Sequence, residues 1–433
     1  MKSSFLPGIA VFLVSSVGVF SQTAPEPTPT PVKLVVTNNL PPPTRFNQPQ
    51  PSPTPIIIGS SSRPRIVDED TDRVNKDSSG PSAAIKSPVV PTDFNTMSFG
   101  QIKSRIAEAK RMLQARPVQT ALEDPSLTNT LVRIAFYDWK TQRVDFVVLS
   151  KDSFLDLKQD TQTVSSSGKA ISVHTIRANG VNTPVILTDK DGQAQLPLMV
   201  QYPVERNGKF YETAYYMSTH PGLVNTEVVG AGRYYVHNVI EIARDRLTGK
   251  GITIQPKVAD IAERLATVEH VDHTRFRNEP SQNIFNDIFT LYALNEGQTY
   301  RYSVSSAGAG GMVQMIPSTY QMIRSRYPSV GLMPDFVEGM RNHVNATQAM
   351  LLYMQMTWND LNSSPTISGA VTSGLATQEQ LMAAGYNSNP AKLAGYINRG
   401  GGEWTGLIPR ETKIYLQIYD ALQRNVPMTA RTR

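Results

Sequence analysis

Apolar positions recur at helical spacing between Ser98 and Pro117, the first part of the chain with a regular hydrophobic pattern after its amino-terminal stretch. Repeats of three and four residues place apolar side chains on one face of a helix. Ser98 can cap this helix with its hydroxyl, and Gln101 can reach back to the backbone N–H of Ser98. We therefore expect folded structure to begin near residue 96 with one amphipathic helix.

Short apolar runs separated by turn residues replace the helical spacing after residue 131. Asp191-Gly192 and Asn207-Gly208 are typical of two-residue hairpin turns, whose central residues take positive φ. The expected strands are 131–137, 144–149, 171–176, 185–187, 196–204 and 210–217. We expect these runs to form a mostly antiparallel, β-rich accessory domain over residues 96–251.

The accessory domain carries many aromatic residues at what looks like strand spacing. They could form a face that stacks on sugars, but aromatic residues at this spacing are more often core. The residues in question are Tyr202, Phe210, Tyr211, Tyr215, Tyr216, Tyr234 and Tyr235. We assign no specific chemistry to this domain.

Helical spacing returns at residue 256 and continues to residue 425 without an alternating strand pattern. We therefore predict an all-α domain over residues 252–425 and a short tail over 426–433. Within it, His270 and His273 lie beside Glu269 and Asp272, which raises the question of a metal site. Three-residue spacing without a third, distant ligand is more typical of a polar helix end, so we expect no metal and no cofactor.

The first residues have the organisation of an export signal. Lys2 is followed by an apolar stretch over residues 5–20, and the small residues Val19 and Ser21 permit cleavage after Ser21. A short membrane anchor is the alternative, but this stretch is shorter than the ~20 residues of a spanning helix. We expect residues 1–21 to be a cleaved signal peptide and the mature protein to be exported to the periplasm or cell wall.

Residues 22–95 are biased in composition. Twelve of the 31 prolines of the chain lie between residues 22 and 64, where the fixed φ and the missing N–H donors favour an extended, solvated chain. Residues 65–91 are rich in Asp, Ser, Lys and Gly and cannot bury enough apolar surface to fold. We expect a disordered tether, which suits reach into a cell wall, with a simple spacer as the alternative.

Composition and charge narrow the chemistry. The 433 residues include no cysteine, which excludes disulfides, thiolate metal sites and cysteine nucleophiles. Lys and Arg outnumber Asp and Glu by 42 to 36, and the pI is near 9.2. This mild excess lacks the clustered basic runs of a nucleic-acid-binding protein. We expect catalysis by oxygen or nitrogen groups and a preference for anionic surfaces such as a wall or membrane.

One stretch of the helical domain carries a chemical signal. Glu296 follows an apolar helical pattern, and the chain after it is rich in Gly, Ser and Ala until it turns apolar again at Met312. A carboxyl at the end of a buried helix, opposite a backbone that a ligand can approach, is a typical placement for an acid with a raised pKa. The glycines could instead bind phosphate, but no strand precedes them and the loop has no lysine.

Three ordered blocks of this domain resemble the soluble lytic transglycosylase family, a relative of goose-type lysozyme. The first runs from Glu296 through Ala-Gly-Ala and Gly-Met-Val-Gln to residue 319, and the second is Gly385-Tyr386-Asn387. The third runs over residues 407–415, and residues 342–353 are similar to the helix that lies between the first two blocks. The resemblance covers residues 255 to 425.

The resemblance implies a lysozyme-like catalytic domain that cleaves the β-1,4 bond between N-acetylmuramic acid and N-acetylglucosamine in peptidoglycan glycan strands. In this family the 6-hydroxyl of the muramic residue attacks, so that 1,6-anhydro ends form and a single Glu, here Glu296, acts as acid and then as base. Together with the hydrophobic pattern of the preceding residues, this resemblance predicts an α+β multidomain fold class, a β-rich accessory domain followed by an all-α lysozyme-like catalytic domain. The implied substrate-binding residues are Ser305, Met312, Gln314, Tyr386, Asn387 and Tyr415.

One departure from the family pattern leaves alternatives open. Gly297 stands where the family usually has a Ser that helps position the carboxyl or the substrate. A catalytically weak peptidoglycan-binding or cell-wall assembly protein is therefore the main alternative. A hydrolysing muramidase would need a second carboxylate, and Glu411 is available, although the resemblance places it in the closing helix. The products of the three differ: a 1,6-anhydro end, no cleavage, and a reducing end.

Overall fold

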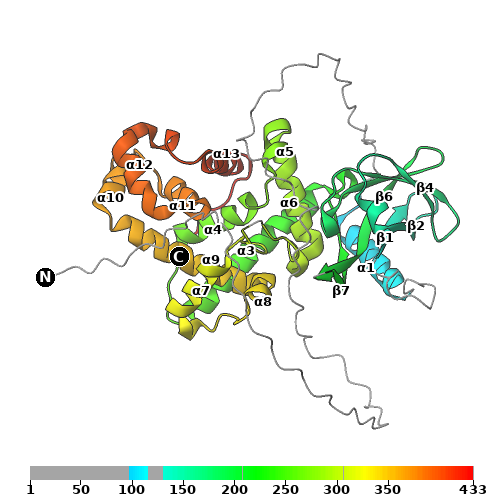
Figure 1. Cartoon of the computed structure of the whole chain (residues 1–433), viewed down its shortest axis with the longest axis horizontal. Coiled ribbons are helices and arrows are strands. Elements are labelled where there is room, and N and C mark those ends of the chain that lie inside the picture. Colours follow the sequence, from blue (N-terminus) through cyan, green and yellow to red (C-terminus); the bar gives the residue numbers. More distant parts are fainter. Residues whose placement is uncertain (1–96, 116–129, 207, 306, 433) are drawn as a thin grey trace, which may run out of the picture. The chain divides into compact units, whose positions relative to one another are not determined.

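The structure is a computed structural model that describes residues 97–115, 130–206, 208–305 and 307–432 (Figure 1). The expected signal peptide and the Pro-rich tether lie outside these residues. Across the described ranges, no helix is both long enough and apolar enough to cross a membrane.

The first described element is helix α1, Phe99–Ala115. The N–H of Ser98 donates to Gln101 Oε1 at 2.9 Å, and the N–H of Gln101 donates to Ser98 Oγ at 3.3 Å. The predicted cap is therefore confirmed, since each side chain satisfies a backbone N–H at the start of the helix. The far end of α1 is tied to the sheet, because Arg133 Nη2 donates to Leu113 O at 2.6 Å.

Seven antiparallel strands follow, in the order β2-β1-β6-β5-β4-β3, with β7 paired to β6. The long strand β6 pairs with β1, β5 and β7 and so connects the two parts of the sheet. The predicted antiparallel β-rich region is confirmed. The strands are β1 (Leu131–Asp138), β2 (Arg143–Ser150), β3 (Thr161–Val164), β4 (Ala170–Thr175), β5 (Val185–Asp189), β6 (Ala194–Arg206) and β7 (Lys209–Tyr216), with the short helices α2 (Lys151–Leu155), η4 (Gly180–Asn182) and η5 (Pro221–Leu223).

The turns between strands follow the local sequence. Gly192 has a φ of 76° in the turn between β5 and β6, and Gly208 has a φ of 72° just before β7. Only glycine adopts this conformation readily, so the two hairpins form where Asp-Gly and Asn-Gly stand in the sequence.

Helix α3, Thr226–Thr248, corrects the prediction that the β-rich domain continues to residue 251. Tyr234 and Tyr235 lie in this helix and not on strands. β-branched and aromatic residues favour strands, but here close helix packing decides. A Cβ on Gly232 would lie 1.8 Å from Phe289 O, so glycine at this position lets α3 pack directly on the backbone of α6. The β-rich region therefore ends at β7, and α3 belongs to the helical region.

The helical region forms as predicted, and within the described part of residues 256–425 the only β pairing is two isolated bridges. Its longer elements are α4 (Pro256–Val268), α6 (Ser281–Asn295), α7 (Pro317–Arg326), α9 (His343–Asn362), α10 (Pro365–Thr372), α11 (Gln378–Asn387), α12 (Leu393–Gly400) and α13 (Arg410–Asn425). The short elements are α5 (His273–Asn278), η6 (Glu296–Gln298), η7 (Pro328–Val330), α8 (Phe336–Arg341), η8 (Pro390–Lys392) and η9 (Gly401–Gly406).

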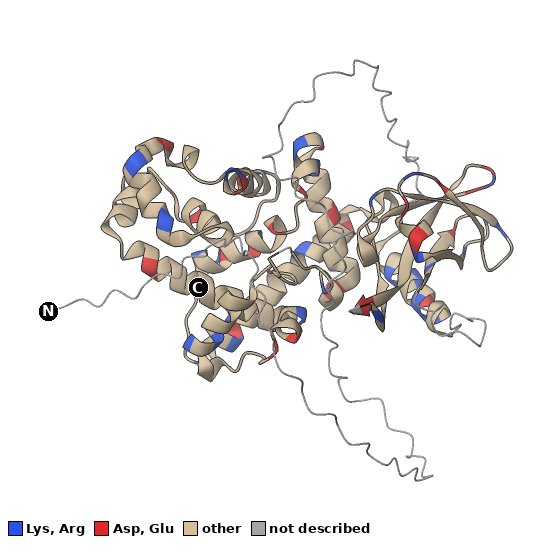
Figure 2. Ribbon diagram, viewed as in Figure 1, with Lys and Arg blue, Asp and Glu red and all other residues tan. Residues whose placement is uncertain are grey.

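The core of the helical region surrounds α9, which is buried along most of its length and packs against α3, α4, α7, α8, α10 and α11. The same hydrophobic cluster continues into the sheet. Polar contacts also join the two regions: Asn295 Nδ2 donates to Met217 O at 3.0 Å, and Met217 N–H donates to Asn295 Oδ1 at 2.8 Å. Lys, Arg, Asp and Glu are scattered over both regions (Figure 2).

Candidate active site

The end of α4 holds a partly buried carboxyl group, that of Glu269. Glu269 is the C-cap residue of α4, and its N–H donates to Leu265 O at 3.0 Å. Helix α5 begins a few residues later, with Asp272 as its N-cap. The predicted polar helix end is therefore confirmed, and it fixes Glu269 in a short turn between two helices.

Two tyrosines of the later motif blocks lie at this turn. Tyr415 of α13 is buried and donates its hydroxyl hydrogen to Glu269 Oε1 at 2.5 Å. Tyr386 of α11 is partly buried and donates to Val313 O at 2.6 Å. Burial raises the pKa of both phenols, so both remain neutral hydrogen-bond donors.

The pKa of the Glu269 carboxyl is raised to about 8, and its burial is the main cause. The negative charge of Glu411 on α13 raises it further, and the hydrogen bond from Tyr415 acts in the opposite direction. Glu269 is therefore protonated at neutral pH, as a general acid must be. Glu269 thus has the burial and the raised pKa that were expected of Glu296 from the sequence.

His270 connects this helix end to the Gly-rich loop. Its Nε2 lies 2.9 Å from Met312 O, and its ring stacks on Tyr300 with ring centroids 3.4 Å apart. Burial lowers the pKa of His270 to about 3, so the ring is neutral and Nε2–H is the donor in this bond. The loop that carries Met312 is thereby held against the turn that carries Glu269.

The remaining predicted residues of the Gly-rich loop hold its shape. Ser305 Oγ accepts from Ala309 N–H at 3.0 Å. Gln314 Nε2 donates to Gly311 O at 2.8 Å. Met312 is fully buried, and its side chain is part of the core. These two hydrogen bonds and the buried Met312 side chain are structural. Met312 O and Val313 O of the same loop accept hydrogen bonds from His270 and Tyr386.

Asn387 and the start of α13 link the second and third motif blocks. Thr412 Oγ1 donates to Asn387 Oδ1 at 2.9 Å. Because Asn387 ends α11 and Thr412 lies in the first turn of α13, this bond holds together the two helices that carry Tyr386 and Tyr415. The structure thus gathers the predicted blocks around Glu269.

Glu296 lies elsewhere, and the expectation that its carboxyl is buried is wrong. Its side chain is 54% exposed and pairs with Lys103 of α1 at 2.6 Å. None of the other six predicted site residues bonds to it within the described ranges. The residue itself has a φ of 46°, whereas Gly297 does not have positive φ, and a Cβ on Gly297 would meet only Tyr235 Oη at 3.8 Å. A Ser is therefore sterically possible at position 297.

The sequence reading missed Glu269 as a functional candidate. A signal was present, because Glu269 directly follows the apolar helix that ends at Val268. The motif register pointed to Glu296, which lies 27 positions later and also follows an apolar helix. As to metals, the described residues contain no cluster of three or more His, Asp or Glu side chains that could hold an ion.

Comparison of the chain with family models, curated proteins and solved structures finds no match in any of the three.

Proposed function

We propose that the helical region is a lysozyme-like lytic transglycosylase domain in which Glu269, and not Glu296, is the general acid. The observation that carries the proposal is the hydrogen bond from buried Tyr415, the tyrosine of the third motif block, to the Glu269 carboxyl. The raised pKa of that carboxyl, caused mainly by burial, supports it. The resemblance of the motif blocks names the reaction class, and the contacts of Tyr386 and Tyr415 favour the end of α4 as its centre.

In this reaction protonated Glu269 donates its proton to the glycosidic oxygen as the bond to C1 of the muramic residue breaks. Because Tyr415 occupies Oε1, the proton is placed on Oε2. The resulting carboxylate then accepts the proton of the muramic 6-hydroxyl while that oxygen bonds to C1, which closes the 1,6-anhydro ring. The Tyr415 hydrogen bond stabilises the carboxylate between the two steps.

Hydrolysis is the second candidate reaction, and Glu411 is the residue that favours it. It lies one turn before Tyr415 on α13, is exposed, and its charge acts on Glu269. A carboxylate on the other side of the sugar could activate a water and yield a reducing end. The transglycosylase proposal needs no such group, because the substrate supplies its own nucleophile.

The proposed setting is outside the cytoplasm, with peptidoglycan glycan strands as the partner. The sequence pattern that predicts an export signal at residues 1–21 and the mild positive charge support this setting. A protein that binds peptidoglycan or assists cell-wall assembly without turnover is the alternative from another class.

The test is digestion of isolated sacculi by the purified mature protein, with the soluble fragments analysed by mass spectrometry. The proposal expects 1,6-anhydro ends from the wild type, a loss of about two orders of magnitude for Glu269→Gln, and a change of only a few-fold for Glu296→Gln. Reducing ends would support hydrolysis. If Glu296→Gln loses activity and Glu269→Gln keeps it, Glu296 at the end of α6 is the general acid. If the wild type cleaves nothing, the wall-binding alternative is favoured.

A further inference from the structure

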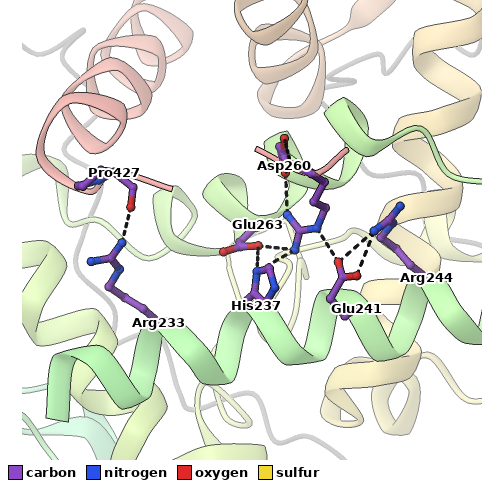
Figure 3. Close-up of polar contacts among 8 residues, drawn as sticks. Arg233, His237, Glu241, Arg244, Asp260, Glu263 and Pro427 are labelled. Atoms are coloured by element: carbon purple, nitrogen blue, oxygen red, sulfur yellow. Dashed lines mark hydrogen bonds and ion pairs between the residues drawn. The ribbon is translucent and has the colours of Figure 1, made fainter. Parts of the chain in front are cut away.

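The chain beyond α13 turns back over the helical region and lies along α3 and α4. Arg233 of α3 donates to Pro427 O (Figure 3). Met428 lines two cavities along this path. The segment also carries Arg431, whose side chain is only 5% exposed. A buried arginine requires partners that compensate its charge.

Those partners form an acidic socket, defined here as Glu241 of α3 with Asp260 and Glu263 of α4. Arg431 Nε donates to Glu241 Oε1 at 2.5 Å, Nη1 to Asp260 Oδ1 at 2.8 Å and Nη2 to Glu263 Oε2 at 2.5 Å. His237 Nδ1 lies 3.0 Å from Glu263 Oε2 and 3.1 Å from Arg431 Nη2. Figure 3 shows that the three acids come from two neighbouring helices and converge between them.

Arg431 separates like charges as well as attracting opposite ones. Without its guanidinium, the carboxylates of Asp260 and Glu263 on α4 would face that of Glu241 on α3. Arg244 pairs with Glu241 at 3.1 Å on the same helix. Removal of Arg431 would therefore replace an attraction between α3 and α4 by a repulsion in a partly desolvated place.

The contacts between Arg431 and the acidic socket, here called the clamp, join helices that build the candidate site. Helix α4 ends at Glu269, six residues or about 9 Å of helix beyond Glu263. The tail continues directly from α13, which supplies Tyr415. Arg431 thus connects the segment that follows α13 to both α4 and α3.

The geometry points to Arg431 as a positioning residue for Glu269, because it holds α4 to α3 and to the end of α13. This inference rests on the proposed role of Glu269. The groups that face Glu269 are Tyr415 and Glu411 from α13, Tyr386 from α11 and Tyr292 from α6. A shift of α4 changes the distance of the Glu269 carboxyl from all four groups. Such a shift also admits water to that carboxyl.

The experiment measures the titration of Glu269 directly, in the full chain with 13C-labelled glutamate carboxyls and with Glu269→Gln to assign the signal. Arg431→Ala should lower the titration midpoint of Glu269 by about one pH unit or more, because water replaces protein around the carboxyl. Arg431→Lys keeps the charge but loses the guanidinium that contacts three carboxylates at once. The Glu269 midpoint in this variant should therefore lie between those of the wild type and Arg431→Ala. Arg424→Ala, a nearby exposed arginine on α13, is the matched control and should leave the midpoint in place.

A compensated variant tests whether repulsion is the cause. Asp260→Asn and Glu263→Gln, added to Arg431→Ala, remove the facing charges. They should reverse at least half of the decrease in the Glu269 midpoint that Arg431→Ala causes. An unchanged Glu269 midpoint in folded Arg431→Ala would overturn the inference. If Arg431→Ala does not fold, a Glu269 midpoint in Arg431→Lys equal to that of Arg424→Ala would overturn it. The readout needs no glycan cleavage, so a protein that cleaves nothing but shows the shift would refute the proposed function and retain the clamp.

Discussion

The ends of α4 and α6 are alike in sequence and differ in their surroundings. Each helix is rich in apolar residues, and each has a Glu as its C-cap residue. Glu269 accepts a hydrogen bond from buried Tyr415 and has a pKa of about 8, whereas Glu296 is half exposed and pairs with Lys103. An acid after an apolar helix is therefore not enough to predict a buried carboxyl. What covers the helix end decides it.

The largest expected effect concerns the loops beside the two helix ends. A Cβ on Gly311 would lie 2.3 Å from Met340 O, and its φ is 66°. Gly311→Ala should lower the free energy of unfolding by about 3 kcal/mol or more. Gly297→Ala, next to Glu296, meets no such clash and should change it by less than about 1 kcal/mol. Urea unfolding of both variants measures the difference, and equal stabilities would show that the loop at the α4 end is not tightly packed.

The next effect is the pH dependence of stability. Because the folded-state pKa of Glu269 lies above its ordinary value of 4.5, the folded protein holds this proton more tightly than the unfolded chain. The stabilisation from this group is present below pH 4.5 and is lost as the pH rises through about 8. Between pH 5 and pH 9, Glu269→Gln should therefore gain on the order of 2 to 4 kcal/mol relative to the wild type. Parallel stability curves for the two proteins would contradict the raised pKa.

The smallest effects come from removing one partner at each helix end. Tyr415→Phe removes a buried hydrogen bond and should cost about 1 kcal/mol in the free energy of unfolding at pH 6. Lys103→Met removes an exposed ion pair of Glu296 and should cost less than about 0.5 kcal/mol. Thermal unfolding of the two variants sharpens the comparison. If Lys103→Met proves the more damaging, the α6 end is better ordered than its exposure indicates.

The elements that could be predicted from the sequence are those whose signals are local. The cap at Ser98, the hairpin glycines Gly192 and Gly208, and the helical spacing from residue 256 all concern residues within one or two turns of each other. Helix α3 was not predicted, because its Val and Tyr residues favour strands. Its helical packing involves a distant residue, since Gly232 lets α3 lie directly against Phe289 of α6. Packing between distant segments overrides intrinsic propensity.

The sequence by itself determined which side chains were available for chemistry: no thiol, a few histidines, and two glutamates at the ends of apolar helices. It also placed Tyr386 and Tyr415 among the candidate site residues. Only the tertiary structure decided that these tyrosines lie with Glu269, since Tyr415 is 146 positions away from it along the chain. The reason is physical: a carboxyl keeps its proton at neutral pH only where other segments remove it from water, and no local pattern records which segments those are.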